Sequence, residues 1–336
     1  MDIDINYNCK YNHAMKFTRH HLILNPVTDL VLPPYKGSTL RGGFGHALKR
    51  VACVDRGREC NGCILRSTCA YSYIFETALF NGVHGKTGGS RLPHPFIIEP
   101  PLDGRQLYKA GDKLDLNLIL VGQAIDYTPH VILAFEELGK MGIGKTRGEY
   151  RDNGKYKIDK VISTGYDGET ETIIYDGKSH IIDDPGVMDS AYFINTSPDS
   201  GCSKITIRFL TPTRIKYNGK FIDDLDFAIL MRNLFRRLSW LAGIHCGEKW
   251  DMDWKGIISR AEEKVRTVDS DLRWHDWERY SNRQEKKLKM GGFMGNITFE
   301  GELDEFVPFL RLGEYLHVGK GTVYGLGKYG VFGDGV

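Results

Sequence analysis

The chain has 336 residues and a mass of 38.1 kDa, enough for two domains with separate hydrophobic cores. Hydrophobic residues make up 41% and charged residues 26%, which excludes a disordered chain. No apolar run approaches the roughly 18 residues of a membrane span, and the acidic, polar start MDIDINYNCK is unlike a secretory signal. We therefore expect a cytoplasmic protein with no membrane partner, whose seven cysteines are thiols or metal ligands.

The formal net charge of +2 conceals an uneven distribution of charge. Residues 36–73 carry seven Lys and Arg against two acidic residues, a net charge of +5. Residues 203–290 carry nineteen against thirteen, a net charge of +6, whereas residues 164–202 carry one against eight, a net charge of −7. We interpret 164–202 as an acidic linker or edge hairpin between two anion-binding domains. Ordinary solvated faces are the alternative.

The first half of the chain alternates strand and helix patterns. Leucines alternate with mostly polar residues over 114–120, which is typical of a strand with one buried face. Thr128 and Pro129 form an N-cap and first-turn pair that predicts the start of a helix. The expected elements, in chain order, are β structure over 15–33 with a turn at Asn25-Pro26, a helix over 38–51, strands over 96–99 and 113–125, a helix over 128–138 and a strand over 149–162.

The second half repeats this plan. Phe227, Leu230 and Leu234 begin an apolar stripe that predicts an amphipathic helix. The expected elements are a strand over 204–216 with a Thr-Pro break, a helix over 226–245, a strand over 293–299, a helix over 307–316 and a strand over 328–332. The repeated order predicts an α+β protein with tandem ferredoxin-like (RRM-like) domains over 1–163 and 203–336. A cysteine-rich insertion occupies about 53–95 of the first domain.

A glycine-rich loop, HVGKGTVYGLGKYG, separates the last predicted helix from the last predicted strand. Glycine lets backbone N–H groups approach an oxyanion without a Cβ in the way. Lysines add positive charge to this loop and tyrosines add stacking faces, a combination that favours a nucleic-acid backbone over a small metabolite. A merely flexible turn is the alternative. The residues concerned are Gly319, Lys320, Gly321, Tyr324, Gly325, Gly327 and Lys328.

The pairing of LRGGFGHALKR near the start with HVGKGTVYGLGKYGVF at the end resembles the CRISPR-associated precursor-crRNA-processing endoribonucleases of the RAMP superfamily. The resemblance extends through CILRSTCAYSYIFET and MGIGKTRGEY. It implies two ferredoxin-like domains and metal-independent cleavage of CRISPR repeat RNA, with 2′,3′-cyclic phosphate and 5′-hydroxyl ends. A non-catalytic RAMP subunit that holds RNA in a CRISPR effector complex is the second hypothesis.

Metal-free RNA cleavage needs a base, an acid and positive charge near the phosphate, and no cofactor. His46 is our candidate for proton transfer, because Lys49 and Arg50 can share its face of the first helix. The resemblance also implies a tyrosine and a lysine near this histidine, and we assign Tyr35 and Lys49. A surface histidine on a basic helix is the alternative. Other candidate histidines are His317, His20 and His21.

Four cysteines follow the first helix with the spacing C-x6-C-x2-C-x5-C: Cys53, Cys60, Cys63 and Cys69. Four thiolates suit a closed tetrahedral zinc site. Such a site would brace the insertion and leave no position open for chemistry. An iron–sulfur cluster and free thiols are the alternatives.

Residues 139–146 (GKMGIGKT) satisfy the phosphate-loop pattern of nucleotide hydrolases. That motif needs a strand before it and a helix after it, whereas here a predicted helix precedes it. A P-loop NTPase is therefore the third and least favoured hypothesis, and Lys145 and Arg147 are expected to contact RNA phosphate instead.

Further basic residues lie on the predicted helices. Arg232, Arg236 and Arg237 lie opposite the leucines of the 226–245 helix, where they could follow a phosphate backbone. Arg50 offers the same charge on the first helix. Residues 279–289 form a further basic, turn-like segment.

Overall fold

The computed structural model describes residues 15–55, 57, 59–77, 92–145, 153–166, 168, 170–179, 184–195, 201–281 and 286–333. The chain divides into two compact units. The N-terminal unit comprises residues 17–188 together with 323–325, and the C-terminal unit comprises 1–16, 189–322 and 326–336. Within the described residues, none of the helices has the length and apolar character needed to cross a membrane.

The N-terminal unit is built on an antiparallel sheet whose strands run in the order β3-β5-β1-β6-β7. Leu114, Leu116 and Leu118 point to the buried face of this sheet, as their alternation predicts. The strands are β1 (Lys16–Pro26), β3 (Phe96–Glu99), β5 (Leu114–Val121), β6 (Tyr156–Thr164) and β7 (Glu171–Tyr175). A separate short pair joins β2 (Leu30–Val31) to β4 (Leu107–Tyr108).

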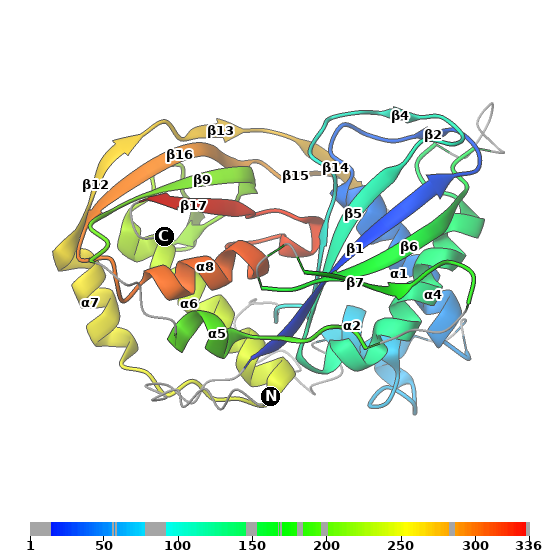
Figure 1. The fold of residues 1–336 in the computed structure, drawn as a ribbon, viewed down its shortest axis with the longest axis horizontal. Coiled ribbons are helices and arrows are strands. Elements are labelled where there is room, and N and C mark those ends of the chain that lie inside the picture. Colours follow the sequence, from blue (N-terminus) through cyan, green and yellow to red (C-terminus); the bar gives the residue numbers. More distant parts are fainter. Residues whose placement is uncertain are drawn as a thin grey trace. The chain divides into compact units, whose positions relative to one another are not determined.

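Helices α1 (Gly37–Ala52) and α4 (Thr128–Met141) cover the buried face of this sheet (Figure 1). Phe44 of α1 stacks on Phe135 of α4 with 5.1 Å between ring centroids. A Cβ on Gly43 would fall 2.7 Å from the Leu138 side chain, so the glycine permits this close approach of the two helices. A short helix α2 (Ala70–Phe75) completes the core.

The C-terminal unit contains a second antiparallel sheet in the order β12-β16-β9-β17. Helix α6 (Phe227–Leu241) begins where the Asp226 side chain accepts a hydrogen bond from the Ala228 N–H. It packs on the sheet through Phe227 and Phe299, whose ring centroids are 4.9 Å apart. Helix α8 (Val307–Leu316) is joined to the sheet by the Tyr329 hydroxyl, which donates to the Leu310 carbonyl at 2.8 Å.

The remaining elements of the chain are shorter or lie outside the two main sheets. Strand β8 pairs with β1, and β13 pairs with β16. The strands are β8 (Met188–Asp189), β9 (Lys204–Thr213), β10 (Lys216–Tyr217), β11 (Lys220–Phe221), β12 (Val265–Ser270), β13 (Arg273–His275), β14 (Glu278–Ser281), β15 (Lys286–Lys289), β16 (Gly292–Gly301) and β17 (Tyr329–Gly333). The helices are α5 (Ser190–Asn195) and α7 (Trp254–Lys264), with short helical turns η1 (Cys60–Gly62), η2 (Gly122–Tyr127), η4 (Ala242–Cys246) and η5 (Thr322–Tyr324).

The two main sheets share one strand order. Counting β1, β3, β5 and β6 in one unit and β9, β12, β16 and β17 in the other, both sheets run second, third, first, fourth. The predicted α+β class and the repeated plan of the two halves are therefore confirmed.

Several boundaries differ from the sequence expectations. The helix expected over 226–245 is α-helical only to Leu241 and continues as a π-helical turn, η4. Strand β9 ends at Thr213, directly after Pro212, which cannot donate a ladder hydrogen bond. The basic segment 279–289 contributes the strands of the β14–β15 hairpin, and the acidic segment 164–202 contains β7, β8 and α5.

Candidate nucleic-acid interface

Helix α1 places His46 and Lys49 one turn apart on the same face. The His46 side chain is exposed, and the Lys49 Nζ lies 5.9 Å from the centre of the Tyr71 ring. Arg50 differs from both, because its Nε donates to the Glu137 Oε1 at 2.7 Å. Of His46, Lys49 and Arg50, it is therefore Arg50 whose charge is balanced by a carboxylate, that of Glu137.

Tyr35 precedes α1 and is separated from His46. With a rise of 1.5 Å per residue, Gly37 and His46 lie about 14 Å apart along the helix axis. The Tyr35 hydroxyl donates to the Tyr324 carbonyl at 2.6 Å. Burial, followed by the charge of Glu99, raises the pKa of Tyr35 well above its ordinary value, so the hydroxyl stays protonated. The structure does not bring Tyr35 to His46; it uses Tyr35 to hold the glycine-rich loop.

The tip of that loop, residues 323–325, belongs to the N-terminal unit. The Arg41 guanidinium lies 5.7 Å from the centre of the Tyr324 ring. Gly325 has φ +79°, and a Cβ there would lie 2.6 Å from Pro100. A glycine is required at this position by the packing of the protein itself, independently of any ligand.

A row of polar side chains crosses the sheet of the N-terminal unit, and sequence analysis did not identify it. Glu99, Asn117 and His21 are directly opposite one another on β3, β5 and β1. The Asn117 Nδ2 donates to the Glu99 Oε2 at 3.0 Å, and the His21 Nδ1 lies 3.1 Å from the Asn117 Oδ1. Glu99 is only 4% exposed, and Arg19 lies 3.7 Å from it. Only the strand register, which sequence spacing does not give, brings these residues together.

The other candidate histidines are buried. His20 is 1% exposed, and burial lowers its pKa to about 4, so the ring is uncharged at neutral pH. The His317 Nδ1 lies 3.0 Å from the Leu326 carbonyl oxygen. His317 therefore fixes the start of the glycine-rich loop and is not presented to solvent.

In the C-terminal unit, the flanks of the glycine-rich loop are fixed by backbone hydrogen bonds. The Val318 N–H donates to the Gly327 carbonyl at 3.0 Å, and the Lys320 N–H donates to the Arg214 carbonyl at 2.9 Å. The Lys328 N–H donates to the Thr211 hydroxyl. All four predicted loop glycines have positive φ: Gly319 (84°), Gly321 (86°), Gly325 (79°) and Gly327 (75°). The loop is therefore a defined structure, not a merely flexible turn.

A group of cations lies beside this loop, and we call Lys216, Arg236, Arg237 and Lys320 the loop cation cluster. Burial and the charges of Arg236, Lys216 and Arg237 together lower the pKa of Lys320. Within the described residues, none of the four pairs with a carboxylate. Such a concentration of positive charge favours a bound anion.

The three arginines of α6 have different surroundings. Arg232 is paired with Glu262 at 2.9 Å. The Arg236 Nη2 donates to the Asn233 Oδ1 at 2.7 Å. The Arg237 Nε donates to the Leu316 carbonyl at 2.8 Å, while its Nη2 is buried without a hydrogen-bond partner among the described residues. The predicted stripe of three equivalent arginines is thus divided, and only Arg236 and Arg237 join the loop cation cluster.

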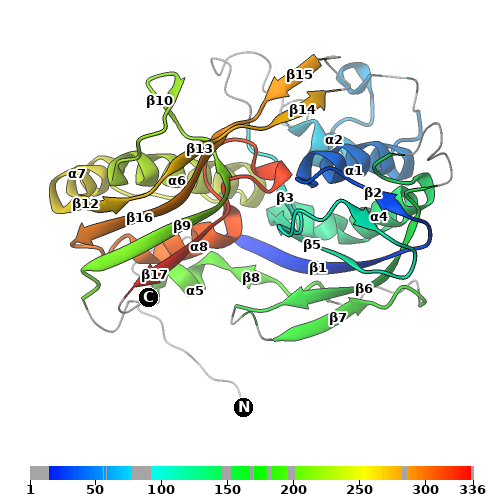
Figure 2. The ribbon, with the colours of Figure 1, turned by 90° about the horizontal axis from the view of Figure 1, so that it is seen from above.

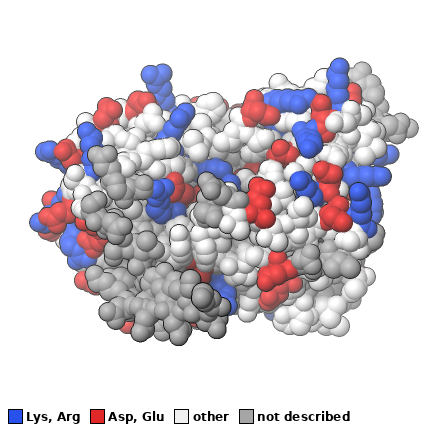
Figure 3. Space-filling view, in the orientation of Figure 1, with Lys and Arg blue, Asp and Glu red and all other residues white. Residues whose placement is uncertain are grey.

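A second feature that sequence analysis missed is the β10–β11 hairpin, which projects from the C-terminal unit (Figure 2). Arg214 and Lys216 lie over the Phe221 ring, at 4.4 and 4.8 Å from its centre. Asn218 and Gly219 form the turn with positive φ. The Asn-Gly pair is a strong hairpin signal that could have revealed it. On the face shown in Figure 3, basic and acidic side chains of the described residues are interspersed.

The phosphate-loop pattern has the wrong structural context. Helix α4 precedes it and ends at Met141. The Lys145 N–H donates to the Val31 carbonyl at 3.0 Å. Residues 139–145 therefore join a helix end to the β2 region and do not follow a strand. Arg147 lies outside the described residues.

Two family models and one relative match this chain. A family model, AF_1859_N, described as an N-terminal domain, matches residues 15–186, and the model of the CRISPR-associated endoribonuclease Cas6 matches residues 207–329. An uncharacterized protein of Archaeoglobus fulgidus is 26% identical over 300 residues, covering 89% of this chain and 92% of the relative.

Solved structures share the fold. Cas6 of Thermus thermophilus covers 95% of this chain and 99% of its own, with a TM-score of 0.54 and 16% identity. A Cas6 product complex gives a TM-score of 0.57 at 16% identity, with 94% and 100% of the two chains covered. The Cas6 domain model and the shared fold together support a CRISPR-associated precursor-crRNA-processing protein. The N-terminal half of the chain thus belongs to the AF_1859_N family, and residues 207–329 match the Cas6 endoribonuclease domain.

Proposed function

We propose that this protein is a metal-independent endoribonuclease that cleaves CRISPR repeat RNA. Attack by a ribose 2′-OH on the adjacent phosphate leaves a 2′,3′-cyclic phosphate on one product and a 5′-hydroxyl on the other. The 2′-OH gives up its proton, and the departing 5′-oxygen gains one. The chain requires no metal for these two proton transfers.

The loop cation cluster carries the RNA-binding part of the proposal. Lys320 and Arg237 are partly enclosed cations without a carboxylate partner in the described structure, and a phosphate backbone supplies the missing negative charge. Gly319, Gly321 and Lys328 belong to the adjoining loop backbone. In the N-terminal unit, Tyr324 at the loop tip offers an aromatic face for a base. Arg50 and Arg232 are paired with carboxylates and are not part of this cluster, and Lys145 is not assigned to it either.

His46 and Lys49 carry the catalytic part. His46 is exposed on α1, and histidine is the side chain that most often transfers protons as a general acid or base. Lys49 on the same face supplies positive charge for the phosphorane-like transition state. Tyr35 contributes by fixing Tyr324 at the loop tip.

The shared strand order of the two sheets supports tandem ferredoxin-like domains, with the acidic segment 164–202 between domains over 1–163 and 203–336. A non-catalytic RNA-binding subunit of a CRISPR effector complex is the second candidate function. This second function is favoured by the distance of Tyr35 from His46, because the expected catalytic group of His46, Tyr35 and Lys49 is then incomplete. One solved relative of similar fold is described as part of a Cas6-RT-Cas1–Cas2 complex.

Cleavage of labelled repeat RNA in EDTA separates the two functions. The nuclease yields a 5′-hydroxyl fragment and a cyclic-phosphate fragment with EDTA present, and an RNA whose cleavage-site 2′-OH is replaced by hydrogen stays intact. Binding without cleavage at saturating protein would favour the non-catalytic subunit. Loss of cleavage in EDTA that magnesium restores would contradict the metal-independent mechanism.

A further inference from the structure

The segment between α1 and α2 lacks a hydrophobic core of its own. None of the described residues within 53–69 is buried, and Val54 and Ile64 are 83% and 86% exposed. The four cysteines are nevertheless only partly exposed, whereas the other described residues of the segment, apart from Arg66, are exposed. Apart from Arg66, the side chains of this segment that are most shielded from solvent are therefore the four cysteine thiols.

The ends of short helical elements fix the positions of these cysteines. Cys53 directly follows α1, and its N–H donates to the Lys49 carbonyl at 3.0 Å. Cys60 and Cys63 bracket the turn η1, closed by the Cys63 N–H donating to the Cys60 carbonyl at 3.2 Å. Cys69 directly precedes α2. All four thus belong to backbone positions that the local fold defines.

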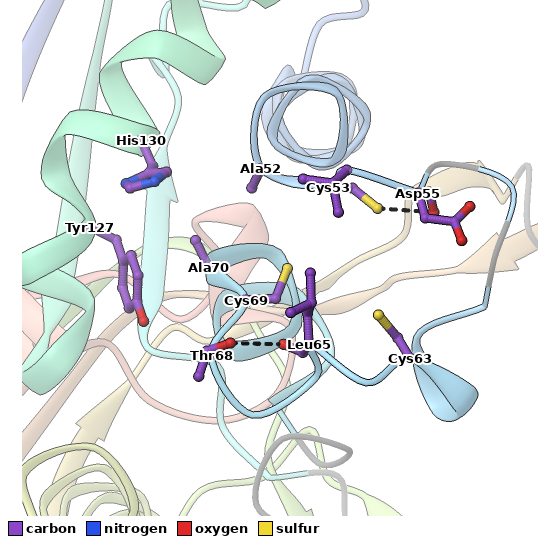
Figure 4. Close-up of a pocket in the computed structure, with 11 residues that line it drawn as sticks. Ala52, Cys53, Asp55, Cys63, Leu65, Thr68, Cys69, Ala70, Tyr127 and His130 are labelled. Carbon is purple, nitrogen blue, oxygen red and sulfur yellow. Dashed lines mark hydrogen bonds between the residues drawn. The ribbon is translucent and has the colours of Figure 1, made fainter.

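Three of the thiols surround one cavity. Cys53, Cys63 and Cys69 line a space of about 260 Å³ that Tyr127 and His130 close on the side of α4 (Figure 4). Cys60 begins the same η1 turn that the backbone of Cys63 closes, so it lies on the side of the cavity that Cys63 lines. As the described side chains are arranged, no three His, Cys, Asp or Glu groups surround a single point closely enough to hold an ion. Closure of the η1 turn toward Cys53 and Cys69 is therefore part of the proposal.

We propose that Cys53, Cys60, Cys63 and Cys69 bind one Zn²⁺ as four thiolates and that the ion replaces the missing core of this segment. Binding releases the four thiol protons and fills the tetrahedral shell, which leaves no position for a water or for RNA. The zinc joins the end of α1 to the start of α2. Its role is structural: chelation that removed it would loosen this segment, and magnesium would not restore it, which distinguishes loss of this ion from a metal-dependent cleavage reaction.

Elemental analysis of the full chain, purified without added metal, tests the proposal. We expect about one zinc per chain, as a single closed site requires. Cys60→Ser combined with Cys63→Ser should lose this zinc, whereas the control variants Cys202→Ser and Cys246→Ser, outside the segment, should keep it. Zinc well below one per chain, or zinc retained in the double variant, would overturn the proposal. Iron with acid-labile sulfide would overturn it in favour of a cluster.

A spectroscopic measurement covers the case in which the double variant fails to fold. The wild-type chain, stripped of metal and refilled with Co²⁺, should show thiolate-to-cobalt charge transfer and the intense visible bands of a tetrahedral site. Stoichiometric zinc should displace both. A weak octahedral spectrum, or no cobalt binding by a folded chain, would exclude four-thiolate coordination.

Discussion

The two units share a strand order and both contain ion pairs, and the contrast between them concerns particular groups of cations. In the N-terminal unit, prominent cations are paired: Lys36 with Asp103 at 3.0 Å and Arg50 with Glu137 at 2.7 Å. In the C-terminal unit, the loop cation cluster has no carboxylate partner among the described residues. The N-terminal unit thus carries the exposed His46 of the proposed chemistry, and the C-terminal unit carries the cation cluster of the proposed RNA contact. A repeated topology does not imply a repeated function.

The largest expected effect concerns His46. His46→Ala should slow cleavage about 10²–10⁴-fold while RNA affinity changes little, because general acid–base groups contribute of that order to rate. Single-turnover cleavage with gel-shift binding measures both quantities. His275→Ala, at an exposed position on β13, is the control. Wild-type rates in His46→Ala would assign the chemistry elsewhere, and His21 in the polar row would then be the next variant.

A second prediction concerns pH and the buried His20. Its folded pKa of about 4 lies below the ordinary 6.5, so the unfolded chain binds the proton more readily. Stability should therefore fall as pH drops from about 6.5 toward 4, by about 3 kcal/mol in total. Denaturant unfolding across this pH range measures the loss. His20→Leu should flatten that pH dependence, and an unchanged slope would contradict the assignment.

The loop cation cluster should affect binding more than turnover. Lys320→Ala should weaken RNA binding and reduce the slope of log affinity against log salt by about 1, as loss of one phosphate contact predicts. Arg236→Ala should behave alike. Arg232→Ala is the matched control on the same helix, because Arg232 is paired with Glu262. Equal losses in Arg232 and Arg236 variants would remove the distinction between the two arginines.

The smallest expected effect concerns Tyr35. Tyr35→Phe leaves the Tyr324 carbonyl without its hydrogen bond and should cost about 1 kcal/mol of stability. Thermal unfolding measures this change. At saturating RNA the cleavage rate should stay within a few-fold of wild type. A rate loss as large as that of His46→Ala would instead place the Tyr35 hydroxyl in the chemistry.

Patterns within a single element were enough to predict much of the fold. The apolar stripe of α6 and the start of α4 at Thr128 follow from local patterns, although the N-cap of α4 is Tyr127 and the Thr128 hydroxyl donates to the Ile125 carbonyl instead of capping the helix. The polar row of Glu99, Asn117 and His21 could not be predicted, since three strands distant in sequence must first acquire a register. The different surroundings of Arg232 and Arg237 likewise depend on Glu262 and Leu316, which lie on other elements. The roles of His46 and the cysteines stay predictions.

Residues 323–325 belong to the N-terminal unit, although they lie near the C-terminal end of the sequence. A single cut between the two units therefore cannot separate the chain into two intact pieces. Val323, 8% exposed, belongs to the hydrophobic core built mainly from residues 22–175, whereas residues 189–322 and 326–336 on either side of 323–325 belong to the other unit. A fragment that stops at residue 188 would lack both this side chain and the carbonyl that Tyr35 requires. We therefore expect split-gene halves to be soluble and active only when coexpressed.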